Sequence, residues 1–111
     1  MMTIESLRAF GADVDAGLVR CLNKEDFYLM LVKKAAADTR LSELAEQLRN
    51  GQLEAAFETA HALKGMYANL SLTPLTKPVS EMTELLRSGT DTDYSALMKE
   101  AEAQFTRLCN L

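Results

Sequence analysis

The sequence contains one histidine, His61, and its neighbours make it a candidate for nucleophilic chemistry. A neutral imidazole nitrogen is a good nucleophile near neutral pH and can carry a group covalently. If the segment is helical, Lys64 and Gly65 lie on the same surface one turn further on. The lysine ammonium would steady the negative oxygens of a transferred group. Because Gly65 has no side chain, it would leave room for the backbone of a partner to approach.

The apolar pattern around His61 predicts that its ring faces solvent. Residues from about 52 to 70 follow a helical period, and their apolar face centres roughly 120° from His61 around the helix axis. That face comprises Leu53, Ala56, Phe57, Ala60, Leu63, Tyr67 and Leu70. The small side chains of Ala62 and Ala68 keep the surface beside the ring flat. The surface expected to receive a partner comprises Phe57, Glu58, Ala62 and Ala68.

The elements that position this surface are expected to be helices. Ala, Leu, Glu, Lys, Met and Arg dominate, and no alternating strand pattern occurs. The expected helices cover 4–10, a short stretch after Asp13, about 23–50, about 52–70, about 74–88, and a last segment opening at Thr90 or Thr92. The fold predicted from the short connections is all-α: an antiparallel up-down four-helix bundle with short additional N-terminal helices.

Two of these helices carry ambiguous signals. Asn23 is expected to cap the longest helix, which either continues to about Asn50 or bends near Asp38-Thr39. Its predicted buried stripe comprises Phe27, Met30, Lys34, Ala37, Leu41, Leu44 and Leu48. Three methionines, Met30, Met82 and Met98, fall on predicted core stripes. Pro78 either kinks the following helix or indicates that its regular part starts nearer Thr76.

Bulk properties favour one soluble domain over residues 1–111. The chain is 48% hydrophobic and 25% charged, with a formal net charge of −4. That charge argues against nucleic acid as a partner, because binding to phosphate backbones needs a basic patch. We find neither a signal-peptide pattern nor an apolar run near the ~20 residues needed to span a bilayer, so a cytoplasmic protein is expected. Cys21 and Cys109 are interpreted as free thiols.

The stretch His61-Ala62-Leu63-Lys64-Gly65 resembles the active-site helix of the histidine-containing phosphotransfer (HPt) domain family. The resemblance runs roughly from Asp13 to Leu108. The flanking residues that also look like the family pattern are Leu53, Phe57, Ala60, Ala68, Asn69 and Leu70. Three positions depart from it: Met66 stands where members often have a small residue, Ser71 stands where they often have a glycine, and Pro78 is unusual.

The resemblance implies a phosphorelay intermediate. His61 would be the phosphoacceptor, Lys64 its electrostatic neighbour and Gly65 the clearance position. The implied partners are response-regulator receiver domains and a hybrid sensor histidine kinase, with Mg²⁺ bound by the receiver. The chain shows no nucleotide-binding loop, which favours a covalent phosphocarrier without its own kinase or cofactor. A monomer is expected.

Three other interpretations stay open at this stage. The chain could be a non-catalytic helical-bundle docking module for response regulators, which would not need His61. It could be a metal- or haem-binding bundle, since Glu58 and His61 have Glu-x-x-His spacing, although a second histidine is missing. It could also assemble as a coiled coil, although the apolar stripes are short and interrupted.

Overall fold

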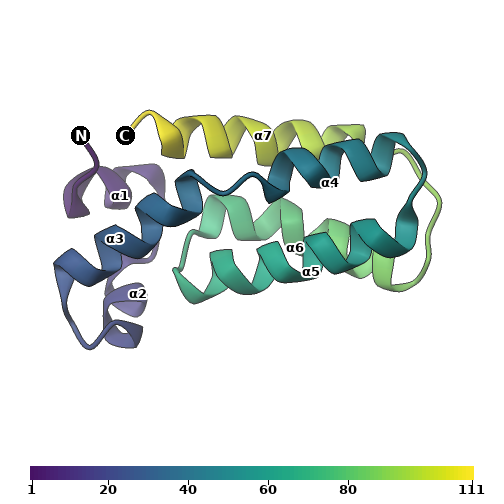
Figure 1. The fold of residues 1–111 in the computed structure, drawn as a ribbon. Helices are drawn as coiled ribbons and strands as arrows, with labels where there is room; N and C mark the ends of the chain where they lie inside the picture. The colour runs from purple at the N-terminus through teal and green to yellow at the C-terminus, as the bar shows by residue number, and fades with distance from the viewer.

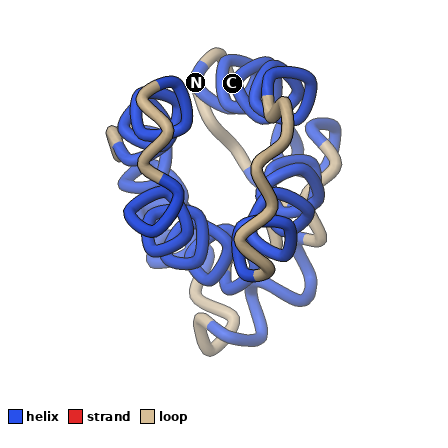
Figure 2. The backbone as a smooth tube through the Cα atoms, turned by 90° about the vertical axis from the view of Figure 1, so that its right-hand side faces the viewer, coloured by secondary structure: helices blue, strands red, loops and turns tan.

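The computed structural model describes all 111 residues and contains seven α-helices and no strand (Figures 1 and 2). The predicted all-α class is therefore confirmed. The helices are α1 (Ile4–Phe10), α2 (Val14–Arg20), α3 (Glu25–Ala36), α4 (Arg40–Arg49), α5 (Leu53–Asn69), α6 (Thr73–Arg87) and α7 (Ser95–Cys109). None of them is long and apolar enough to cross a membrane.

Helices α4 to α7 lie side by side, and successive ones run in opposite directions (Figure 1). α4 packs on α5, α5 on α6 and α6 on α7. α4 and α7 also line a common hollow, so the four helices surround one core, which Figure 2 shows nearly end-on. Fully buried residues from all four fill that core: Leu44, Ala60, Leu63, Val79, Met82, Ala101 and Leu108.

Helices α1 to α3 lie at one end of this group, beside both chain termini (Figure 1). Thr3 caps α1 through a capping box with Ser6, and Gly11 ends it at a φ of 110°. The Asp13 side chain caps α2 by accepting from the amide of Ala16. The predicted bounds of α1 and the predicted start of α2 are confirmed, because the caps there are local signals.

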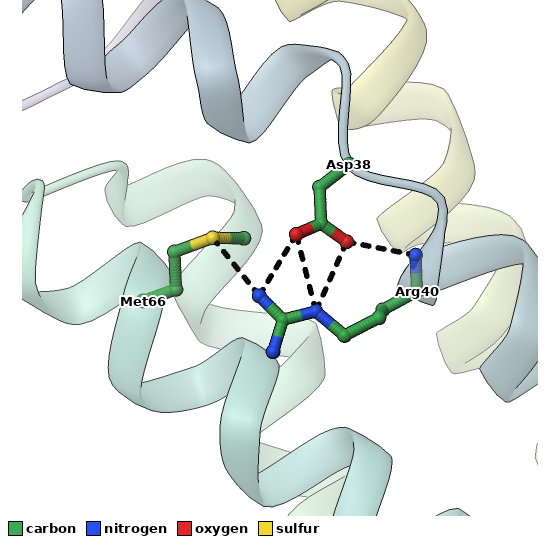
Figure 3. Close-up of polar contacts among 3 residues, drawn as sticks. All are labelled: Asp38, Arg40 and Met66. Atoms are coloured by element: carbon green, nitrogen blue, oxygen red, sulfur yellow. Dashed lines mark hydrogen bonds and ion pairs between the residues drawn. The ribbon is translucent and has the colours of Figure 1, made fainter.

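The predicted longest helix is in fact two helices, so of the two alternatives the bend near Asp38-Thr39 is correct. The Asp38 carboxylate accepts from the backbone amide of Arg40 at 2.9 Å and from its guanidinium at 2.8–3.1 Å. This paired carboxylate holds the start of α4 in place of an N-cap side chain. The same guanidinium donates to the Met66 sulfur at 3.4 Å and so ties the break to α5 (Figure 3).

The buried stripe predicted for α3 is wrong. Phe27 and Met30 are exposed, whereas Tyr28, Val32 and Ala35 are buried. The predicted stripe assumed that 23–50 is one helix, so it placed Phe27 and Met30 on the same face as the leucines of α4. Because the helix breaks, the two halves have independent phases. Asn23 is also not the cap: it has a φ of 58°, and Lys24 occupies the N-cap position without a side-chain bond.

The last two helices also begin at other residues than expected. α6 begins at Thr73, with Leu72 at its N-cap, and it continues through the buried Pro78. α7 begins at Ser95, whose amide donates to the Asp93 carboxylate at 2.9 Å, and neither Thr90 nor Thr92 opens it. Met82 and Met98 are buried as predicted.

Candidate functional site

Helix α5 carries every residue of the predicted site. Its apolar face packs inward as the 100° period requires, with Ala56, Ala60, Leu63 and Tyr67 buried and Leu53 and Phe57 half-buried. His61 is exposed on the opposite flank. The prediction that the imidazole faces solvent is therefore confirmed.

The His61 ring is stacked on Phe57. The two ring centroids lie 5.7 Å apart and the planes make an angle of 19°. Stacking occupies one face of the imidazole, whereas the nitrogen lone pairs lie in the ring plane and point away from that contact. No hydrogen bond within the chain uses either nitrogen, so both are free to meet a partner.

Helix α6 supplies two charged side chains, Glu84 and Arg87, to this surface. The guanidinium carbon of Arg87 lies 5.1 Å from the centroid of the Phe57 ring, in a cation–π contact. Lys64 lies on the same flank of α5 and forms an ion pair with Glu84, with Nζ 3.6 Å from Oε2. The same Oε2 lies 3.4 Å from Nε of Arg87. One carboxylate oxygen therefore holds both cations near His61.

The rest of the α5 surface around His61 carries three small residues and one large side chain, Glu58. Glu58, Ala62, Gly65 and Ala68 are all exposed. A methyl group placed on Gly65 would meet no heavy atom within 4 Å outside its own helix. Tight packing inside the chain therefore does not explain this glycine, and the surface around it is open to a partner.

Two hollows flank His61 along the α5–α6 surface. One, of about 630 Å³, is lined by Phe57, Glu58 and Arg87 among others. The second, of about 600 Å³, lies toward the C-terminal end of α5 and includes Ala68 and Glu84. α2 contributes Ala16 and Arg20 to this second hollow, and its N-cap residue Asp13 also lines it. Helix α2 therefore borders the candidate docking surface, which the sequence did not indicate.

The departure at Ser71 has a structural explanation. α5 ends in a Schellman motif, with the amide of Leu72 donating to the Tyr67 carbonyl and that of Ser71 to Ala68. Ser71 has a φ of 57°, a conformation that favours glycine. Its hydroxyl accepts from Arg20 at 2.7 Å, and this bond offsets part of the strain. Met66, the other departure on α5, packs against the core as expected.

Sequence reasoning missed Glu84, Arg87 and Arg20. Glu84 and Arg87 are three residues apart on one helix, a spacing that suggests a pair with each other. Nothing in the sequence indicates that this pair faces Lys64 and Phe57, because that depends on how α6 is rotated against α5. Arg20 lies about fifty residues from its acceptors Asn69 and Ser71, so its contact is invisible to local patterns.

The interpretation of the chain as a metal- or haem-binding bundle required several acidic or histidine ligands from facing helices. No group of three His, Cys, Asp or Glu side chains lies close enough together to hold a metal ion. Glu58 and His61 both project outward from α5. The arrangement instead offers an exposed nucleophile, two adjacent cations and an open surface.

These features define a class of protein: an all-helical chain that presents an exposed imidazole on the surface of one helix. The model of the Hpt domain family matches residues 31–111, and the chain belongs to this family. The match begins within α3, so α1 and α2 lie outside it, whereas the resemblance in the sequence was placed from Asp13. Searches of curated proteins and of solved structures found no match. At the level of the family, the function is histidine phosphotransfer in phosphorelay signalling, with receiver domains and histidine kinases as partners.

Proposed function

We propose that this protein is a phosphorelay carrier in which His61 accepts a phosphoryl group from the aspartyl-phosphate of one receiver domain and passes it to another. The donor receiver would belong to a hybrid sensor histidine kinase. The observation that carries the proposal is the exposed imidazole on α5 with an open glycine surface one turn away, in a chain of the Hpt domain family.

The transfer requires only one nucleophile from this chain. The lone pair of a ring nitrogen of neutral His61 forms the N–P bond, while the P–O bond to the receiver aspartate breaks and the aspartate leaves as a carboxylate. The phosphorylated ring keeps the proton on its other nitrogen. Transfer onward reverses these bond changes on a second receiver, so no nucleotide and no net proton is consumed.

The other site residues assist by position and charge. Phe57 supports one face of the imidazole and fixes the direction of its edge. Lys64 offers positive charge to the phosphoryl oxygens. These oxygens are negatively charged, and the neutral imidazole of His61 carries no charge that would balance them. Gly65, with Glu58, Ala62 and Ala68, leaves the open flank on which a receiver would dock. The receiver would bring its own Mg²⁺, and in-line geometry would come from docking.

The architecture supports this proposal. We infer that α4 to α7 form the antiparallel up-down four-helix bundle and that residues 1–111 fold as a single monomeric domain. α5 and α6 would then present the site on one rigid face of that bundle, where its position depends on core packing and not on a loop.

Incubation with a phosphorylated receiver domain tests the assignment. Label should move to the wild-type chain, resist alkali, be released by acid, and be absent from a His61→Gln variant. Glutamine keeps a polar side chain at an exposed position, so the variant should fold and still bind the receiver. An Asn69→Gln variant, altered on the same helix, should accept label like wild type.

The outcome also separates the carrier from a docking module that lacks phosphotransfer. Wild type that binds phosphorylated receivers but never takes label would support the docking module. Equal labelling of wild type and the His61→Gln chain would show that His61 is not the acceptor.

A further inference from the structure

We propose that Glu84 is a positioning residue that holds Lys64 near unmodified His61 and yields it to the phosphoryl group once His61 is phosphorylated. The inference rests on the proposed role of His61. It starts from one geometric fact: a single carboxylate oxygen of Glu84 contacts Nζ of Lys64 at 3.6 Å and Nε of Arg87 at 3.4 Å.

The contact leaves Lys64 already partnered in the unmodified protein. Lys64 is on α5 and Glu84 on α6, so the pair crosses between the two helices and is not set by local helix spacing. Lys64 follows His61 by about one helical turn on α5, and its side chain is about one-third exposed. Before Lys64 can bind phosphoryl oxygens, its bond with Glu84 must weaken.

Lys64 should exchange Glu84 for the phosphoryl group because its ion pair with Glu84 is weak and the phosphoryl group carries more negative charge than the carboxylate. Glu84 is 56% exposed, and an exposed ion pair of this kind contributes little. A phosphoryl group carries a charge of about −1.5 to −2, against −1 for the carboxylate. Phosphorylation therefore draws Lys64 toward His61, and Glu84 keeps Arg87 as its partner.

The contacts of Arg87 determine which of the two cations leaves Glu84 on phosphorylation. Its guanidinium also lies over the ring of Phe57, on which His61 is stacked. Two contacts hold Arg87, whereas Lys64 has the carboxylate alone. Lys64 is therefore the cation that moves, and Arg87 retains Glu84 near the site.

The consequence is a bias in the phosphorylation equilibrium. Glu84 stabilises the unmodified state by partnering Lys64, and it repels the phosphoryl group by its own charge. Both effects favour onward transfer of the phosphoryl group. Removing the carboxylate should shift the equilibrium between phosphorylated receiver and phosphorylated His61 toward His61.

The test compares Glu84→Gln with wild type in full chains, using one purified receiver domain and measuring the equilibrium distribution of label. We expect a shift of about two- to five-fold toward phosphorylated His61, the range that corresponds to one exposed ion pair. The shift should shrink at high salt. Glu81→Gln makes the same charge change on an exposed position of α6 that forms no ion pair, and it should shift the distribution less.

A double variant with Lys64→Gln identifies the route. Because part of the effect of Glu84 acts through Lys64, the Glu84→Gln change should shift the distribution less in the Lys64→Gln background, and an undiminished shift there would overturn the role given to Lys64. An unchanged distribution in Glu84→Gln, or an equal shift in Glu81→Gln, would overturn the proposal while leaving His61 as the acceptor. Failure of wild type to take label at all would instead overturn the proposed function. Urea unfolding of each variant is the control that shows it is folded.

Discussion

Two helical glycines have opposite surroundings, and the same substitution should have opposite effects at the two positions. Gly65 faces open space beside His61. Gly17, in α2, is buried, and a methyl group placed there would lie 2.5 Å from Cε1 of Tyr28. Space inside the fold therefore requires a glycine at Gly17 and does not require one at Gly65.

Gly65→Ala should stabilise the chain and impair phosphotransfer. Alanine is better than glycine inside a helix by about 1 kcal/mol, and nothing in the fold opposes the added methyl group. The free energy of unfolding, measured with urea, should rise by up to about this amount. The rate of label transfer from a receiver should fall, because the methyl group stands where the partner approaches.

Gly17→Ala provides the matched control. The Tyr28 ring must move to admit the methyl group, so the free energy of unfolding should fall by about 1–3 kcal/mol. If Gly65→Ala accepts label as fast as wild type, Gly65 is not a clearance position.

At the residue scale, the sequence was sufficient to predict whether a side chain is exposed or buried wherever the period of a single helix determines this. It predicted the exposure of His61 and the inward face of α5, because one helix has one phase. It could not predict Glu84 or Arg87 as neighbours of the site. Their contacts with Lys64 and Phe57 depend on the rotation of α6 against α5, which the packing of many core residues determines.

Among the elements, the break between α3 and α4 is held by the Asp38–Arg40 pair (Figure 3). Hydrogen bonds from the Arg40 side chain lower the pKa of Asp38 below its ordinary value. A lowered pKa means that the folded state binds the proton less readily than the unfolded state. The contribution of Asp38 is therefore complete above the unfolded pKa of about 3.9 and is lost as the pH falls through the lower folded value.

Asp38→Asn should lower the free energy of unfolding at neutral pH by about 1 kcal/mol, since the pair is partly exposed. Urea unfolding measured from neutral to acid pH should show the difference from wild type narrowing below about pH 4. Asp15→Asn removes the partner of Arg8 in an exposed pair and should have a smaller effect. An equal effect at both positions would mean that the break does not depend on Asp38.

This break also explains which elements the sequence predicted well. The N-caps of α1 and α2 are formed by side chains within four residues, and the predicted bounds of α1 and start of α2 were correct. The predicted stripe of α3 failed because α3 and α4 do not share a phase. Phe27 and Met30 fit the continuous pattern, but Tyr28 is the residue whose hydroxyl reaches the end of α5.

On the scale of the whole molecule, α2 with its N-cap and α3 both contact the turn that ends α5. The Tyr28 hydroxyl donates to the Leu70 carbonyl at 2.8 Å, and the amide of Asp13 donates to the Ser71 carbonyl at 2.9 Å. Arg20 donates to Asn69 and Ser71. Residues outside the match to the Hpt domain family therefore support the C-terminal end of α5. Local sequence patterns could not reveal this, since the partners are about forty to sixty residues apart.

Tyr28→Phe should weaken this attachment with a characteristic dependence on pH. At neutral pH the loss of the hydroxyl leaves the buried Leu70 carbonyl without its donor, and the free energy of unfolding should fall by about 1–2 kcal/mol. Burial raises the pKa of Tyr28 to about 12. The unfolded tyrosine ionises near pH 10, so the wild-type contribution is complete below that pH and is lost as the pH rises toward about 12.

The phenylalanine variant has no such group to ionise at this position. Its free energy of unfolding, followed by urea titration from about pH 8 to pH 12, should decline less steeply than that of wild type. Burial also raises the pKa of Tyr67, which acts in the same direction in both proteins and cancels in the comparison. A difference between variant and wild type that stays constant across this range would mean that Tyr28 does not link the N-terminal helices to α5 through a protonated hydroxyl.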